Sequence, residues 1–313
     1  MPQFREITSG LQFPEGPVAM ADGSVIITEL RGGRIVRVAP DGAHTTVAET
    51  GGGGNGAAVG PDGHLYVCNN GGFNWVEVNG KLTPMDGLPP NYAGGRIQRV
   101  NLDTGYVETL YTECNGHQLR APNDLVFDAS GSFWFTDFGW VQPGQKDRCG
   151  IYYAAPDGSR IEEKVYPIDG PNGIGLGPGD RTLYVAQTFE GRVWQWDLSG
   201  PGTFTRAQKG EAELLAGPGG SKLLAGLPGY QLLDSMAVDS AGNVCVATLL
   251  NGGIAVIAPD GTVLEHVATP DPLTTNICFG GPDLQIAYIT LTTQGKLVAM
   301  DWPRSGLPLH YTA

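Results

Sequence analysis

The chain has 313 residues, of which 41% are hydrophobic, and its formal net charge is −13. This acidic balance argues against a nucleic-acid partner, which would need a basic stripe, and no apolar run of eighteen or more residues offers a membrane span. Its 48 glycines and 23 prolines are spread along the chain, a pattern typical of many short strands and turns. The N-terminus lacks a signal-peptide pattern, so we expect a cytoplasmic, all-β protein with one domain over residues 1–313.

In chain order, one short unit recurs six times. Each copy opens with a polar residue, here called the anchor, and a β-rich triplet follows a turn about eleven positions later. The copies begin at Glu15 (EGPVAMADGSVIIT), Asn55 (NGAAVGPDGHLYVC), Asn123 (NDLVFDASGSFWFT), Asn172 (NGIGLGPGDRTLYVA), Asp234 (DSMAVDSAGNVCVA) and Asn276 (NICFGGPDLQIAYIT).

A second hairpin pattern follows each copy: a glycine, an alternating run and another turn. These patterns begin at Gly33, Gly95, Gly150, Gly191, Gly253 and Gly295. Two hairpins per unit predict four antiparallel strands, and six such units predict a six-bladed β-propeller. Residues 3–8 are expected to add an outer strand to the last blade, with the GLPLHYTA tail close by, because such pairing removes exposed edges.

The repeat also predicts which end of the propeller carries a site. The tight turns within hairpins share one end, so the long connections 70–94, 105–122, 138–149 and 200–232 are expected at the opposite end. The anchors begin the innermost strands at that end, beside the central channel. The residues that end the second strands are expected there too: Glu29, Asn69, Asp137, Gln187, Thr248 and Thr290. Loops on a rigid scaffold are where binding sites are usually built.

The six anchors offer only oxygen ligands, without Cys or His. Hard cations prefer this set, and Ca²⁺ accepts six to eight oxygens from carboxylates, amides and water. Asn and Asp also begin strands simply as turn formers, which would explain any one anchor. Six anchors in register, including Glu15, a poor turn former, favour a divalent metal site in the channel instead.

Four segments resemble one protein family. They are FPEGP at 13–17, APNDLVFD at 121–128, PNGIGLGP at 171–178 and LLDSMAVD at 232–239. With these motifs the chain resembles, over nearly its whole length, the senescence-marker-protein/gluconolactonase/luciferin-regenerating-like (regucalcin-like) family, a relative of diisopropyl-fluorophosphatase. The resemblance implies one divalent metal, Ca²⁺ first and Zn²⁺, Mn²⁺, Mg²⁺ or Fe²⁺ as alternatives. It implies as ligands Glu15, Asn123, Asn172 and Asp234.

Substrate contacts are less uniform within that family. In some members the residue matching Asn123 contacts substrate or water, and we predict substrate contacts for Asn123, Arg120, His117 and Asn55. Regucalcin-type sugar lactonases carry a basic residue at the position of Ala121, which this sequence lacks.

Aromatic residues occur in two of the long connections. Phe73, Trp75 and Tyr92 lie in 70–94, and Trp140 lies in 138–149. They indicate a substrate less polar than a free sugar lactone.

These features predict a metal-dependent hydrolase that opens a small lactone, with the metal as Lewis acid. Asp234 is expected to act as general base or nucleophile, with a role as ligand only as the alternative. Other interpretations are a phosphotriesterase-like hydrolase, a calcium-binding propeller without activity and an interaction scaffold. Cys114 and Cys149 lie in predicted loops but are expected to stay reduced, as cytosolic thiols usually do.

Overall fold

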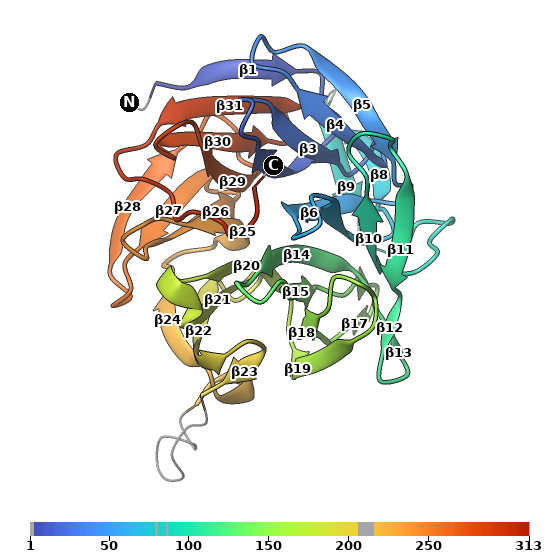
Figure 1. Ribbon diagram of the computed structural model, residues 1–313, viewed down its shortest axis with the longest axis vertical. Helices are drawn as coiled ribbons and strands as arrows, with labels where there is room; N and C mark the ends of the chain where they lie inside the picture. Colours follow the sequence, from blue (N-terminus) through green and yellow to red (C-terminus); the bar gives the residue numbers. More distant parts are fainter. Residues whose placement is uncertain (1–2, 79–80, 86, 206–215, 313) are drawn as a thin grey trace.

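The structure of the chain is a computed structural model that describes residues 3–78, 81–85, 87–205 and 216–312. Six antiparallel sheets surround a central axis as the blades of a propeller (Figure 1). The predicted six-bladed β-propeller with four strands per blade is confirmed. The innermost strands of neighbouring blades contact one another all the way round the ring.

The first three blades follow one another along the chain. Blade 1 contains β2 (Pro14–Ala19), β3 (Val25–Glu29), β4 (Arg34–Val38) and β5 (His44–Glu49). Blade 2 contains β6 (Gly54–Val59), β7 (Leu65–Asn69), β10 (Arg96–Val100) and β11 (Val107–Tyr111). Blade 3 contains β14 (Pro122–Phe127), β15 (Phe133–Asp137), β18 (Cys149–Ala154) and β19 (Ile161–Ile168).

The remaining blades complete the ring. Blade 4 contains β20 (Pro171–Leu176), β21 (Thr182–Gln187), β22 (Arg192–Gly200) and β24 (Lys222–Gly226), with a short β23 (Thr203–Phe204) beside β22. Blade 5 contains β25 (Leu232–Val238), β26 (Val244–Leu249), β27 (Gly253–Ile257) and β28 (Val263–Ala268). Blade 6 contains β29 (Thr274–Gly280), β30 (Ile286–Leu291), β31 (Lys296–Asp301) and β1 (Arg5–Ser9).

Closure of the ring joins the two ends of the chain. As predicted, the N-terminal segment is the outer strand of the last blade, with β1 antiparallel to β31. The C-terminal tail continues further than expected and lies near the centre of the ring in Figure 1. There the backbone N–H of Leu307 bonds to Val238 O, the His310 ring contacts Asp180 and the Tyr311 ring packs on Phe127. The tail therefore spans blades 5, 4 and 3 on the face that carries the tight turns.

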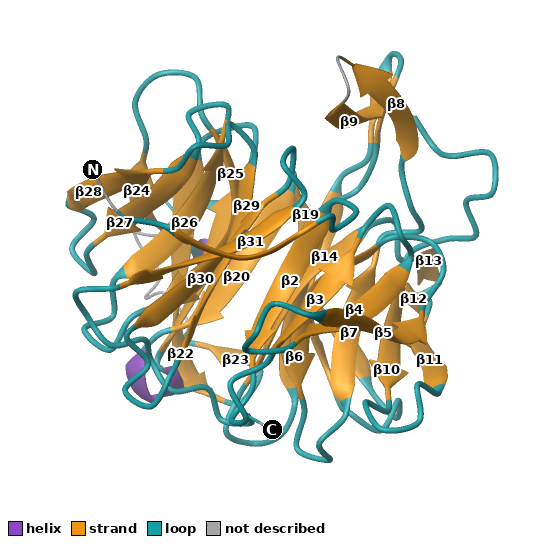
Figure 2. Cartoon of the chain, turned by 90° about the horizontal axis from the view of Figure 1, so that it is seen from above, coloured by secondary structure: helices purple, strands orange, loops and turns teal. Residues whose placement is uncertain are grey.

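Three small hairpins interrupt the loops: β8 (Asn74–Val78) with β9 (Lys81–Met85), β12 (Glu113–Cys114) with β13 (His117–Gln118), and β16 (Val141–Gln142) with β17 (Gln145–Lys146). The β8–β9 hairpin projects from the face opposite the C-terminus (Figure 2). The predicted connections 105–122 and 200–232 were too long, because they contain β11 and β24, the outer strands of blades 2 and 4.

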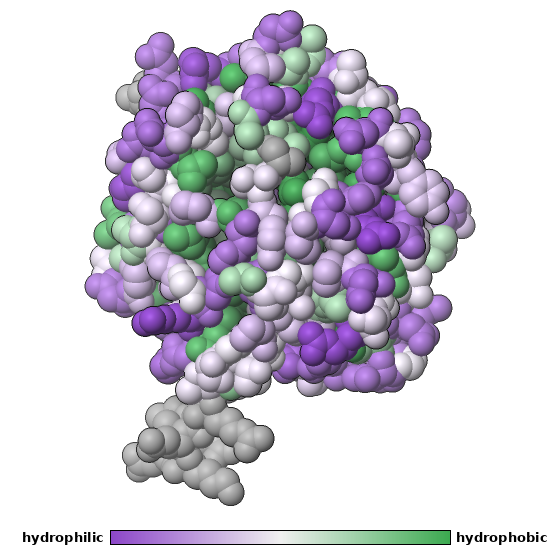
Figure 3. Space-filling view, viewed as in Figure 1, coloured by the Kyte–Doolittle hydropathy of each residue, from purple (hydrophilic) through white to green (hydrophobic). Residues whose placement is uncertain are grey.

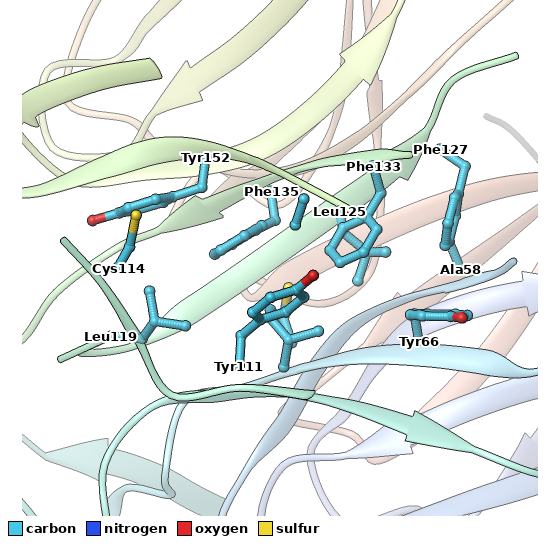
Figure 4. Packing of buried hydrophobic residues seen from close by; sticks show 13 residues of the cluster. Ala58, Tyr66, Tyr111, Cys114, Leu119, Leu125, Phe127, Phe133, Phe135 and Tyr152 are labelled. Atoms are coloured by element: carbon cyan, nitrogen blue, oxygen red, sulfur yellow. The ribbon is translucent and has the colours of Figure 1, made fainter. Parts of the chain in front are cut away.

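Apolar side chains fill the spaces between blades. The cluster between blades 2 and 3 joins rings from several strands (Figure 4). Tyr66, Phe127 and Phe133 contact one another in tilted or edge-to-face geometry. Burying a side chain of this kind contributes roughly 1.5–3 kcal/mol, so the interfaces between blades stabilise the ring without any ion.

The surface on the C-terminal face is hydrophilic around most of its rim, with hydrophobic residues showing nearer the centre (Figure 3). In the described part of the chain, no helix is long and apolar enough to cross a membrane. Cys114 and Cys149 are both free thiols.

Candidate active site

Each anchor lies where the pairing of its inner strand is irregular. The register between first and second strands shifts at or next to the anchor in every blade, for example between Glu15 and Val18 and between Leu233 and Met236. Bulges of this kind re-aim a side chain out of the regular alternation. All six anchors are buried as a result.

Threonines of the second strands hold the anchors of the next blade in place. Thr28 Oγ1 donates to Asn55 O at 2.6 Å, and Thr136 Oγ1 donates to Asn172 O at 2.6 Å. The residue after Asn55 must be glycine, because a Cβ on Gly56 would collide with the Asp124 carboxylate and the Asn123 backbone. Adjacent inner strands can therefore approach closely around the axis.

Five of the six anchors line one cavity of about 260 Å³: Glu15, Asn55, Asn123, Asn172 and Asp234. The sixth, Asn276, acts through a neighbour, since its Nδ2 donates to Glu15 Oε2 at 2.9 Å. The structure thus brings together the four residues predicted as ligands, and Asn55 beside them. Their roles remain predictions.

The amide oxygens of three anchors in this cavity have no hydrogen-bond partner among the described residues. Oδ1 of Asn55, Asn123 and Asn172 is buried and unpaired in the part of the chain that the structure describes. A buried polar atom without a partner lowers the stability of the fold by about 1–3 kcal/mol. Three such atoms around one cavity therefore indicate that a ligand binds there. Amide and carboxylate oxygens gathered around one cavity are ligands of the kind that a hard cation prefers.

The two carboxylates have raised affinities for protons. Burial raises the pKa of Glu15 to about 6, although bonds from Asn276 and Gly16 counteract it. Burial, and then the charge of Glu15, raise the pKa of Asp234 well above its usual range. Asp124 lies close enough for Glu15 to act on it, and burial first and Glu15 second raise its pKa to about 7. A cation at this place would stabilise the charged forms.

Among the described residues, no group of three or more His, Cys, Asp or Glu side chains forms a metal site. The channel set is consistent with this, because only Glu15 and Asp234 are carboxylates and asparagine supplies the other oxygens. Such a mixture suits Ca²⁺ better than it suits metals that prefer His or Cys.

The five anchors that line the cavity are here called its floor, and the other residues that line it are called its wall. The wall is mostly apolar. It includes Phe13, Leu30, Phe73, Phe138, Trp140, Phe189, Leu232 and Leu249. Sequence analysis identified Phe73 and Trp140 from their loops, whereas the aliphatic residues carried no signal beyond their hydrophobicity. Trp75 and Tyr92 support the wall from behind, since Trp75 packs on Phe73 and Tyr92 packs on Trp140.

Arg120 and His117 lie elsewhere. Both line a second, more open cavity of about 490 Å³ beside blade 3, and neither lines the channel cavity. Arg120 is turned away by Asp147, whose Oδ2 lies 2.8 Å from its Nε. His117 stacks on Tyr166. Ala121, by contrast, lines the channel cavity, so the position expected to carry a basic residue presents only a methyl group.

The residues that end the second strands lie at the predicted end but bind backbone. Asp137 accepts hydrogen bonds from the N–H groups of Arg120 and Ala121 at 2.7 and 2.6 Å. Asn69 Oδ1 accepts from Gly53 and Gly71. These side chains fasten the loops that lead into the anchors and thereby fix the geometry of the cavity.

The chain is similar to known proteins along most of its length. The family model described as SMP-30/Gluconolactonase/LRE-like region matches residues 13–293. A gluconolactonase from Zymomonas mobilis is 27% identical over 301 residues, which cover 88% of this chain and 75% of the relative. A lactonase drp35 from Staphylococcus haemolyticus is 27% identical and covers 86% of this chain and 73% of its own.

A solved structure shares the fold. The calcium-binding protein regucalcin from Agrobacterium tumefaciens superimposes with a TM-score of 0.75 at 17% identity, covering 99% of this chain and 98% of its own. Because the family model spans most of its length, this chain belongs to the SMP-30/gluconolactonase/LRE-like family.

Proposed function

We propose that this protein is a lactone hydrolase that works in the central channel with one divalent cation, Ca²⁺ first. The observation that carries the proposal is the convergence of three unpaired amide oxygens and two carboxylates at the floor of one apolar cavity. The relatives named as gluconolactonase and lactonase supply the reaction class.

The residues that would hold the cation are Glu15, Asn123, Asn172 and Asp234. Their carboxylate and amide oxygens are ligands that Ca²⁺ prefers, and the two carboxylates balance the charge of a divalent cation. When bound, the ion would supply Lewis acidity toward the lactone carbonyl. Asn55 offers a further unpaired oxygen, which is available to an ion or to a water in the same cavity.

The chain's own residues would prepare the reaction in three ways. The apolar walls exclude bulk water and strengthen electrostatic interactions at the floor. Glu15 is held rigid by Asn276 and Gly16, so the floor is pre-organised. Asp234 is the remaining carboxylate among the anchors, and we assign it the role of taking a proton from the attacking water at a carboxylate oxygen.

A calcium-binding propeller without activity is the second candidate, favoured by the fold shared with regucalcin. The two functions separate in one experiment. Protein stripped with a chelator is reloaded with Ca²⁺, Zn²⁺, Mn²⁺ or Mg²⁺ and assayed on a panel of lactones and one phosphotriester. Lactone turnover restored by metal supports the proposal, whereas metal binding without turnover supports the second candidate. Turnover of the phosphotriester alone would replace the lactone with that substrate.

A further inference from the structure

Among the described residues, the side chains that line the channel cavity beyond the five anchors are mostly apolar. Besides the five anchors, its polar side chains are Asn70, Thr188 and Thr275. Each makes at least one hydrogen bond within the protein: Asn70 Oδ1 accepts from Gly72 N, Thr188 Oγ1 accepts from Asn172, and Thr275 bonds to two threonine hydroxyls. The Asn70 amide nitrogen and the Thr188 hydroxyl proton are therefore the polar groups that this wall can still offer.

The aromatic residues also turn their polar atoms away. Trp140 Nε1 donates to Arg120 O at 3.0 Å, and the Tyr92 hydroxyl donates to the same carbonyl. Trp140 therefore offers the cavity only its apolar surface.

These rings form a continuous, preformed wall. Phe13 packs on Trp75 at 4.8 Å between ring centroids, Phe73 packs on Trp75 at 5.7 Å, and Phe73 packs on Trp140 at 5.1 Å. All three contacts are edge-to-face, the geometry that aromatic pairs prefer. At the mouth, Met85 of the β8–β9 hairpin lines the cavity while half exposed, and methionine adapts to irregular apolar ligands.

The floor of the cavity carries oxygen atoms, whereas its wall is mostly apolar. From this contrast we propose that the substrate is a lactone whose ring carries an apolar alkyl or aryl substituent, and that polyhydroxylated sugar lactones are rejected. The inference rests on the proposed lactone hydrolysis and adds the substrate class. The carbonyl end would meet the oxygen-lined floor, and the substituent would lie against Phe73 and Trp140. Each sugar hydroxyl placed against this wall would lose its water partners, at a cost on the order of ten- to a hundredfold in affinity.

Three lactones with the same six-membered ring test this: δ-valerolactone, δ-decalactone, which adds a pentyl chain, and glucono-δ-lactone. After subtraction of spontaneous hydrolysis, we expect kcat/KM for δ-decalactone to exceed that for δ-valerolactone at least tenfold, with glucono-δ-lactone lowest. Equal or faster turnover of glucono-δ-lactone would overturn the inference and leave the lactonase function standing.

A binding measurement separates the inference from the reaction. The lactams piperidin-2-one and 6-pentylpiperidin-2-one keep the ring but have no ester to hydrolyse. Calorimetry should show tighter binding of the pentyl lactam, with a more negative heat-capacity change from apolar burial. Such binding without turnover of any lactone would support the apolar ligand class and remove the proposed function. No preference between the two lactams would overturn the inference.

One variant locates the effect. Phe73→Ala should raise KM for δ-decalactone about tenfold, equivalent to about 1.4 kcal/mol, and leave KM for δ-valerolactone unchanged. Tyr106→Ala is the control, because Tyr106 is an exposed aromatic residue beside the tight turn between β10 and β11. An equal loss for both lactones in Phe73→Ala would show that Phe73 does not contact the substituent and would contradict the assignment.

Discussion

Asn276 donates a hydrogen bond from Nδ2 to Glu15 Oε2 at 2.9 Å, although 261 residues separate the two along the chain. The N–H of Gly16 donates to the same oxygen at 2.8 Å. Neither bond uses Oε1. Because Glu15 belongs to the first blade and Asn276 to the last, closing the ring also orients the carboxylate at its centre.

Glu15→Gln should weaken Ca²⁺ binding strongly, because it removes one of the two negative charges among the anchors. Asn276→Ala should weaken binding by roughly 10–100-fold, the usual cost of losing a residue that orients a ligand. Calorimetric titration of Ca²⁺ into metal-free protein measures both. Glu49→Gln is the control, since it changes the same charge at an exposed position of β5. An unchanged affinity in Glu15→Gln would exclude Glu15 from the metal site.

Asn123→Leu should separate stability from metal binding. The unpaired Oδ1 of Asn123 costs the metal-free protein about 1–3 kcal/mol, and leucine of similar size removes that atom. We therefore expect a Tm without metal equal to or above that of the wild type. Ca²⁺ at 100 times its Kd stabilises a one-site protein by about 2.7 kcal/mol, and the variant should lose most of this gain. Thermal unfolding with and without Ca²⁺ measures both effects. A clear drop in Tm without metal would mean that Oδ1 has a partner in the folded protein.

The ring of anchors could be predicted because hairpin turns and alternating strands repeat in the sequence. Side-chain directions that depend on distant loops could not. Arg120 and Ala121 are neighbours in the sequence, yet Asp147, from another loop, draws Arg120 into the second cavity while Ala121 lines the first. Asn276 was predicted as an anchor, but its bond to Glu15 depends on ring closure.

Blade 4 shows a second limit of sequence patterns. The Ser-Gly at 199–200 resembles the turn before an outer strand in the other units. In the structure, Leu198 and Gly200 pair with β23, and the outer strand is β24, which pairs with the first part of β22. An insertion that forms its own pairing cannot be distinguished locally from the regular repeat. The β8–β9 hairpin was missed despite Asn-Gly at 79–80, a strong hairpin signal between alternating runs.

Removal of the metal should abolish activity and leave the propeller folded. The six apolar clusters lie between and within blades, and the β1–β31 pairing closes the ring without an ion. Small metal-nucleated domains behave differently, because their folding energy comes from the ion. Far-ultraviolet circular dichroism in EDTA at room temperature is the measurement. Loss of the β signal there would show that the ion is structural.

Asp234→Asn tests the chemical step. Asparagine keeps an oxygen of the same size for the cation and removes the group that takes the proton. If Asp234 is the base or nucleophile, kcat should fall by at least about 10²–10⁴-fold, and the loss should persist at metal concentrations that saturate the variant. Asp283→Asn, at an exposed position in the tight turn between β29 and β30, should leave kcat unchanged. A ligand-only role predicts instead that kcat recovers once metal is raised, because the only defect would be weaker binding. Calorimetry on the same variant fixes the saturating concentration, so recovery or persistence of the loss decides between a proton-transfer group and one ligand among four.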